Sequence, residues 1–276
     1  MLYKSPLVYN WYNIPIKDFE RMNSMRAPQE ILDVWQIFDD KPMDTLMKLW
    51  WSKQNSGGSQ RSFSLMKEHF EQYGVAGNCV DLSLWLIEEF RIAGIEAFGI
   101  TDDVDAERAH IAVIAVDSEG FRYLCDLGDQ WIQPIAIDGR VVNGEDFTDG
   151  YFPAAKVKLV TDEYKTSISY QRPNGKVSKA VYNTKPLNDI LLWEISERVQ
   201  RVFRKTPLVE IRISIEGEMA HWEFDNWASF LSTSQKLHVE ESNLNLEQWI
   251  ERIHMRTGMK KEFLQEALNF YKNMDA

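Results

Sequence analysis

The chain has 276 residues, 44% of them hydrophobic and 12% aromatic, so it can bury the core of one large domain or two small ones. Its formal net charge of −11 opposes binding to phosphate backbones and to anionic lipid. Nucleic-acid and membrane-surface functions are therefore not expected, and small molecules are the favoured partners.

The start of the sequence, residues 1–6, is followed by polar and charged residues rather than by the apolar core of a secretion signal. No apolar run approaches the roughly 20 residues that cross a bilayer. We therefore expect a cytoplasmic protein. In that compartment the two cysteines, Cys79 and Cys125, remain reduced thiols.

The first quarter of the chain is predicted to be mainly helical. Residues 28–51 have the pattern of one or two helices, and residues 63–73 form another that ends at Gly74. Between them, the polar run 53–60 is typical of a mobile loop.

Cys79 opens an amphipathic stretch. Apolar residues recur after it at three- and four-residue intervals as far as Gly94, which predicts a buried helix of about four turns. The partial positive charge of a helix N-terminus stabilises a thiolate, and its free N–H groups can receive an oxyanion. Cys79, in the first turn, is therefore well placed for activation.

Strands follow this helix. Residues 95–100 predict a short strand, and residues 110–116 and 121–127 predict a hairpin because turn-forming residues separate two apolar runs. The hairpin carries the next two chemically interesting side chains.

The register of this hairpin decides whether those side chains meet. A three-residue loop that pairs Val116 with Gly120 sets His110 directly opposite Asp126, with both side chains on one face. A register different by a single residue separates them onto opposite faces. We predict the first arrangement.

Cysteine, histidine and aspartate in this order form a complete set for acyl transfer. The imidazole takes the proton of the thiol, and the carboxylate holds the imidazole tautomer and stabilises its cation. Each residue also has a structural explanation: Cys79 as a small buried hydrophobe and His110 as a hydrogen-bonded strand residue. Asp126 is harder to explain this way, because it interrupts an apolar strand and needs a partner if buried. Cys125 alternates to the other face and is assigned to the core.

Four segments together resemble the core of the transglutaminase-like and arylamine N-acetyltransferase superfamily: Gly77–Ser83, Arg91–Ala97, Ala109–Val113 and Cys125–Gly128. The resemblance covers about residues 75–137. It implies an α+β fold with a papain-like or transglutaminase-like core, in which the cysteine helix packs against an antiparallel sheet or barrel.

The resemblance also implies roles for three residues: Cys79 as nucleophile, His110 as base and Asp126 as the orienting carboxylate. In the arylamine N-acetyltransferase branch, acetyl-CoA is the co-substrate, an amine is the acceptor and no metal takes part. The chain length and a helical N-terminal part resemble this branch.

A second branch stays open, because the Gly-x-Cys-x-Asp pattern and the Arg-x-x-Gly-Ile helix exit are closer to transglutaminase-like proteins. The same triad then serves an amidase or protease. A binding module with an idle triad is the non-enzymatic alternative. The sequence indicates no oligomeric state.

The chain is expected to contain a helical part at 1–75, a catalytic core at 76–160 and a C-terminal α/β layer at 161–276, within one compact unit. The layer is predicted to hold two hairpins and three helices. These elements are the strand pairs 165–170 with 177–182 and 209–215 with 219–224, and the helices 187–203, 246–255 and 260–274.

The remaining polar residues receive structural assignments. His221 is interpreted as a packed or surface strand residue, and no pair of histidines has the spacing of metal ligands. Asp102, Asp103 and Asp105 lack the glycine and terminal glutamate of a calcium-binding loop and are assigned to a solvated loop.

Overall fold

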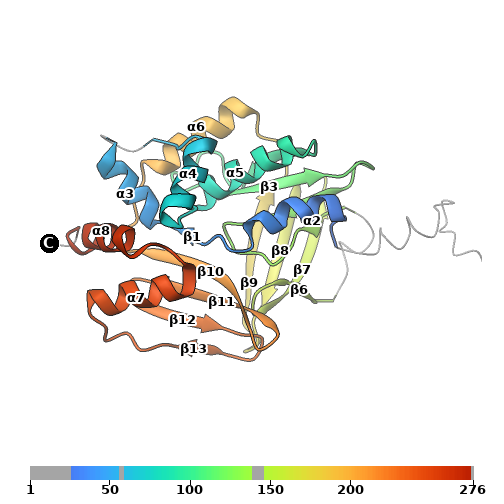
Figure 1. The fold of residues 1–276 in the computed structure, drawn as a ribbon. Helices are drawn as coiled ribbons and strands as arrows, with labels where there is room; N and C mark the ends of the chain where they lie inside the picture. Colours follow the sequence, from blue (N-terminus) through green and yellow to red (C-terminus); the bar gives the residue numbers. More distant parts are fainter. Residues whose placement is uncertain (1–25, 56–58, 139–145, 275–276) are drawn as a thin grey trace, which may run out of the picture.

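The computed structural model describes residues 26–55, 59–138 and 146–274 (Figure 1). The start of the chain that bears on secretion, and the middle of the predicted 53–60 loop, lie outside these ranges. Among the described residues, none of the helices combines the length and apolar character needed to cross a membrane.

Residues 26–75 contain the helices predicted for the N-terminal part, although a short strand interrupts them. These elements are α2 (Gln29–Trp35), the 3-10 helix η1 (Gln36–Phe38), β1 (Met43–Asp44), α3 (Leu46–Gln54) and α4 (Phe63–Tyr73), and α5 (Cys79–Ile92) follows them. Helix α4 has the predicted bounds, and Gly74 ends it in the left-handed conformation with φ 71°.

The centre of the molecule is an antiparallel eight-stranded sheet in the order β5-β4-β3-β2-β9-β8-β7-β6. Its strands are β2 (Glu96–Thr101), β3 (Ile111–Val116), β4 (Arg122–Cys125), β5 (Ile135–Ala136), β6 (Thr148–Phe152), β7 (Ala155–Asp162), β8 (Lys165–Gln171) and β9 (Val177–Asn183). The two edges approach each other, since the N–H of Ile132 donates to the carbonyl of Tyr151 at 2.9 Å. The sheet is therefore a nearly closed barrel.

Helix α5 packs against β3 and β2 of this barrel (Figure 1). Its apolar stripe Leu82, Trp85, Leu86 and Phe90 is buried, and residues 111–115 of β3 are completely buried. The predicted periodicity of α5 thus corresponds to its buried face, and this packing fixes the helix N-terminus at one end of the barrel strands.

The register predicted for the β3–β4 hairpin is wrong by two residues. Val116 pairs with Arg122 rather than with Gly120, because the turn closes one residue later, where the Asp117 N–H donates to the Phe121 carbonyl. Side chains alternate with a period of two, so a shift of two leaves every side chain on its predicted face. His110 and Asp126, adjacent to the ends of β3 and β4, still meet.

The C-terminal part forms a second antiparallel sheet in the order β1-β10-β11-β12-β13, with α7 and α8 packed on it (Figure 1). Its elements are α6 (Asp189–Gln200), β10 (Leu208–Ile215), β11 (Glu218–Asp225), β12 (Ala228–Ser232), β13 (Leu237–Val239), α7 (Leu246–Thr257) and α8 (Lys261–Lys272). The predicted α+β fold class is confirmed. The division at residue 160 stays a prediction, and the barrel contains strands from both sides of it.

Strand β1 joins the C-terminal sheet to the turn where α5 begins. Met43 pairs with Glu210 of β10, and the Asp44 N–H donates to the Gly77 carbonyl at 2.8 Å. The segment before Cys79 is thereby attached to the C-terminal sheet.

Candidate active site

Cys79 is the first residue of α5, as the sequence predicts. The side-chain oxygen of Asn78 accepts hydrogen bonds from the N–H groups of Val80 and Asp81, and Asp81 Oδ2 accepts one from the Asn78 N–H. This capping box fixes the first turn. The N–H of Cys79 has no hydrogen-bond acceptor among the described residues, so it is available to a ligand.

A buried ion pair shapes the turn before Cys79. Arg61 lies 3.2 Å from Asp81, the two side chains are 2% and 1% exposed, and Arg61 also donates to the Ala76 carbonyl at 2.7 Å. Gly77 has φ 111°, and a Cβ there would lie 2.3 Å from both the Arg61 guanidinium and the Asp81 carboxylate. Only glycine leaves room for this ion pair.

An amide network connects the same turn to α6. Asn78 donates to Gln200 Oε1 at 3.0 Å, Gln200 donates to Gln60 Oε1 at 2.9 Å, and Gln60 donates to Asp81 Oδ1 at 2.8 Å. The sequence did not identify Arg61, Gln60 and Gln200, because these residues approach the turn before Cys79 from separate segments. The network completes the hydrogen bonding of a buried helix start.

His110 and Asp126 form a close pair, with 2.7 Å between Nε2 and Oδ2. Asp126 is fully buried, and two further donors reach it: the Tyr182 hydroxyl at 2.8 Å and the Asp129 N–H at 3.0 Å. Tyr182 comes from β9, 56 residues later in the chain, and was not identified from the sequence. The carboxylate is thus held by three donors.

The opposite charges of His110 and Asp126 stabilise each other. Burial alone lowers the pKa of His110, but the Asp126 charge, its hydrogen bond and a hydrogen bond with Cys79 raise that pKa well above its usual value. Burial raises the pKa of Asp126, while the His110 charge and the three hydrogen bonds lower it, and the net direction is down. Asp126 is therefore ionised and favours a protonated imidazole.

Gly128 allows the cysteine and the histidine to approach each other. A Cβ at this position would lie 2.5 Å from Cβ of Cys79 and 2.9 Å from Cε1 of His110. Because Nε2 of His110 faces Asp126, Nδ1 is the ring nitrogen left for the thiol. The structure thus brings together the three residues that the sequence analysis selected.

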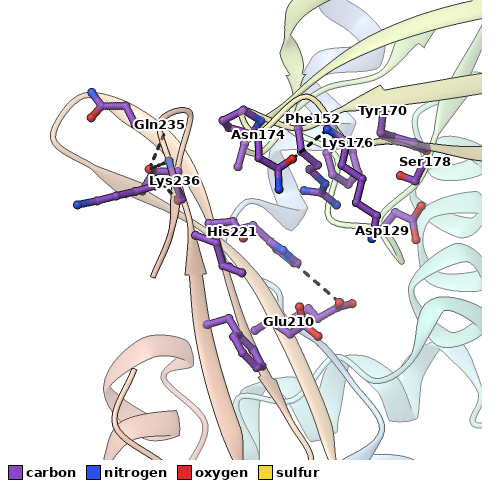
Figure 2. Close-up of a pocket in the computed structure, with 18 of the residues that line it drawn as sticks. Asp129, Phe152, Tyr170, Asn174, Lys176, Ser178, Glu210, His221, Gln235 and Lys236 are labelled. Atoms are coloured by element: carbon purple, nitrogen blue, oxygen red, sulfur yellow. Dashed lines mark hydrogen bonds and ion pairs between the residues drawn. The ribbon is translucent and has the colours of Figure 1, made fainter. Parts of the chain in front are cut away.

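Two cavities meet beside this group. Cys79 and His110 line one of about 290 Å³, together with Lys48 and Arg108. The other has a volume of about 830 Å³ and lies between the barrel and the C-terminal sheet (Figure 2). Asp129 and Glu210 line both cavities, so the two cavities adjoin at these residues.

Lys48 contributes positive charge near the sulfur. Its ammonium donates to the carbonyls of Val199 and Val202 at the C-terminal end of α6. Burial lowers the pKa of Lys48 to about 8, against the opposing influence of Cys79 and Asp81.

A metal site is the other arrangement that these groups allow. The ligand atoms of His110, Asp126 and Asp129 lie within 4.8 Å of one another. However, Nε2 of His110 faces Asp126 directly, and both Asp126 oxygens accept hydrogen bonds from protein donors. This bonding is typical of a triad with an oriented imidazole.

The other cysteine, histidine and aspartate residues considered in the sequence lie outside the group of Cys79, His110 and Asp126. Cys125 lies in the core, where burial raises the pKa of its thiol. His69 packs among Trp50, Trp51 and Tyr73. In the exposed loop, Asp102 accepts a hydrogen bond from the His110 N–H at 3.1 Å. His221 is a buried strand residue, and it lines the larger cavity.

No protein-family model and no curated protein matches the chain. Solved structures do. The arylamine N-acetyltransferase of M. tuberculosis superposes with a TM-score of 0.69 at 13% identity, covering 94% of this chain and 98% of that one. The Mycobacterium marinum arylamine N-acetyltransferase in complex with CoA gives 0.65 at 11% identity, covering 91% and 96%. The enzyme of Salmonella typhimurium gives the same values. The chain therefore has the fold of the arylamine N-acetyltransferases.

Proposed function

We propose that the protein is a cysteine-dependent N-acyltransferase that moves an acetyl or related acyl group from a CoA thioester through Cys79 to an amine. The main observation is the contact of Cys79, at the start of α5, with a His110 whose other ring nitrogen lies 2.7 Å from buried Asp126. This arrangement supplies a nucleophile, a base and the group that orients the base.

In the first half-reaction, His110 holds the proton that Cys79 has released, and the Cys79 thiolate attacks the thioester carbonyl. The Cys79 N–H is free to donate to the oxyanion. The carbon–sulfur bond to the donor then breaks, and His110 returns the proton to the departing thiolate. In the second half-reaction the amine attacks the acyl-Cys79, His110 accepts its proton, and Cys79 leaves as a thiolate.

The larger cavity supports a phosphorylated donor. Its lining includes four cationic residues from the β8–β9 and β12–β13 hairpins: Arg172, Lys176, Lys179 and Lys236. Cationic side chains near the cavity wall suit phosphate groups. The volume of about 830 Å³ lies in the range of ligand sites, and the cavity leads to Cys79 through Asp129 and Glu210.

Intact-protein mass spectrometry after brief exposure to acetyl-CoA tests the proposal. We expect one acetyl adduct, absent in Cys79→Ala and removed by excess amine. If no adduct forms although a small reagent alkylates Cys79 rapidly, the acyltransferase proposal is wrong and amide substrates become the next candidates. If alkylation is also slow, the idle binding module is favoured.

A further inference from the structure

Three carboxylates line the larger cavity, and none of them forms a close ion pair with the four cationic residues of the same lining. Glu210 and Glu223 are direct cross-strand partners on β10 and β11, and Asp129 lines the same cavity. Like charges directly opposite in a sheet are destabilising. Among the described residues, no lysine or arginine nitrogen lies within 4.0 Å of a carboxylate oxygen of these three residues. Their negative charge is therefore not compensated by close ion pairs.

His221 is a second, independent sign of a ligand. Its side chain is 9% exposed, and within the described part of the chain its buried Nε2 has no hydrogen-bond partner. The nearest carboxylate oxygen, on Glu210, is 4.0 Å away (Figure 2). A buried ring nitrogen without a partner is unfavourable unless a bound group supplies one.

The pKa values of this cluster follow from burial and from its own negative charge. Burial, together with Glu223 and Asp129, raises the pKa of Glu210 to about 8, and burial and Asp126 raise the pKa of Asp129 to about 6. Burial and Arg172 lower the pKa of His221 to about 4, so its imidazole is neutral at pH 7. A bound ammonium reverses the repulsion between the carboxylates.

The cluster suits an organic cation better than a metal ion. Among the described residues, the ligand atoms that converge within 4.8 Å belong to His110, Asp126 and Asp129, and this group does not include Glu210, Glu223 or His221. The cluster is thus wider than a metal coordination sphere. An ammonium group with several N–H donors can reach acceptors spread over such a distance.

We propose that the acyl acceptor is an aliphatic diamine, with one ammonium bound by Asp129, Glu210 and Glu223 beside His221 and a second amino group directed at acyl-Cys79. The proposal rests on the proposed function and names its acceptor class. Asp129 and Glu210 line both cavities, which places the anchor next to the reaction site.

The chemistry of the second amino group balances without a further reactant. This amino group attacks as the neutral amine, forms the amide carbon–nitrogen bond and breaks the carbon–sulfur bond to Cys79. Its proton passes to His110, and Cys79 becomes a thiolate. The anchored ammonium stays protonated throughout, so it contributes binding and orientation rather than reactivity.

The test is the deacylation rate of acetyl-Cys79 protein, prepared with acetyl-CoA, in the presence of equal concentrations of three amines. We expect 1,4-diaminobutane to react at least about tenfold faster than 1-aminobutane or aniline, because only the diamine is both anchored and reactive. Glu210→Gln should remove this preference by slowing the reaction of 1,4-diaminobutane at least about tenfold, to the rate of 1-aminobutane in the same variant. Glu163→Gln, in the exposed β7–β8 turn, is the matched control and should change nothing.

An aniline rate above the diamine rate, or an equal loss of both rates in Glu210→Gln, overturns the diamine proposal. Calorimetry of the unacylated protein with 1,4-diaminobutane, and separately with calcium chloride, tests the anchor alone. Diamine binding that depends on Glu210 supports the anchor even if acetyl-CoA never acylates Cys79, so its failure and that of the acyltransferase proposal are distinguishable. Calcium binding at the cluster without diamine binding overturns it.

Discussion

Two carboxylates near the proposed reaction, the fully buried Asp126 and the partly buried Glu210, differ in how their charge is balanced. Asp126, at the end of barrel strand β4, receives hydrogen bonds from His110, Tyr182 and the Asp129 backbone. Glu210, on β10 of the C-terminal sheet, lies opposite Glu223, and the one basic group within 4.0 Å of its carboxylate among the described residues is His221. The pKa of Asp126 is lowered, whereas burial and its acidic neighbours raise that of Glu210 to about 8.

Burial alone does not decide the charge of a carboxyl group. Both groups lose water, but donors compensate Asp126 within the protein, and Glu210 faces further negative charge. In the two proposals above, the barrel side therefore supplies the catalytic groups, and the carboxylates on the sheet side bind the acceptor. Each variant below changes either the barrel site or the carboxylates of the C-terminal sheet.

The largest effect is expected from Asp126→Asn. The amide cannot stabilise the imidazolium or maintain the same His110 tautomer, so acylation of Cys79 should slow by about 10³-fold or more. Stopped-time mass spectrometry of the acetyl adduct measures this rate. A loss of less than about tenfold in a folded variant would contradict the role assigned to Asp126.

The same variant tests the charge balance through stability. His110, with its raised pKa, stabilises the fold fully below pH 6.5 and less as pH rises through that raised value. Asp126, with its lowered pKa, contributes above pH 3.8 and less as pH falls through its folded-state value. The stability difference between wild type and Asp126→Asn should therefore be largest between about pH 4 and pH 6.5 in urea unfolding.

Gly128→Ala is expected to have the next largest effect. The new methyl group must displace Cys79 or His110, because the added Cβ would lie 2.5 Å from Cβ of Cys79. A displacement near 1 Å costs about 10²-fold in rate. Gly99→Ala is the matched control, since the three atoms nearest to its Cβ all belong to the flexible end of Leu192, at 2.9 Å or more, and none belongs to Cys79 or His110. Equal rates in the two variants would show that close packing at Gly128 does not matter.

Tyr182→Phe should have a smaller effect. It removes one of the three donors to Asp126 and leaves His110 and the Asp129 N–H in place. We expect acylation to slow by about tenfold, since a hydrogen bond to a charged group contributes about 1.5 kcal/mol or more. The lost bond also lets the pKa of Asp126 rise, so the acid limb of the pH–rate profile should move to higher pH. An unchanged acid limb would contradict this coupling.

The residues that could be predicted from the sequence are those fixed by local periodicity. The 3.6-residue pattern after Cys79 located the start of α5, and strand alternation placed His110 and Asp126 on one face although the register was wrong by two. An error of two residues in the register does not change the face on which a side chain lies, because side chains alternate between the faces with a period of two. The proposed triad therefore needed no knowledge of the tertiary structure.

The residues that escaped prediction depend on the order of strands and on distant segments. Tyr182 reaches Asp126 because β9 lies beside β2 in the barrel, and no local pattern encodes that neighbourhood. Arg61, in the segment before α4, and Gln200, at the end of α6, approach the turn before Cys79 in the same way. The short strands β1, β5 and β13, of two or three residues, are too brief for an alternation to be recognised.

Glu210→Gln should give the smallest change, which is a change in thermal stability. An increase in Tm would distinguish Glu210 from Asp126, whose replacement lowers stability. Because the folded state holds the Glu210 proton up to about pH 8 and the unfolded chain releases it near pH 4.5, wild-type stability falls as pH rises through this interval. The glutamine variant does not lose this stability, so its Tm should equal that of wild type at pH 4 and exceed it by about 2–5 °C at pH 8.5.

Glu210 lies directly opposite Glu223 in the sheet. Removing the charge of Glu210 therefore also removes its repulsion of the Glu223 carboxylate. If 1,4-diaminobutane raises the wild-type Tm at pH 8.5 but leaves the variant unchanged, the repulsion between Glu210 and Glu223 and the affinity for a cation have the same origin. A variant that is less stable at every pH would instead mean that Glu210 holds the sheet together, and the contrast with Asp126 would disappear.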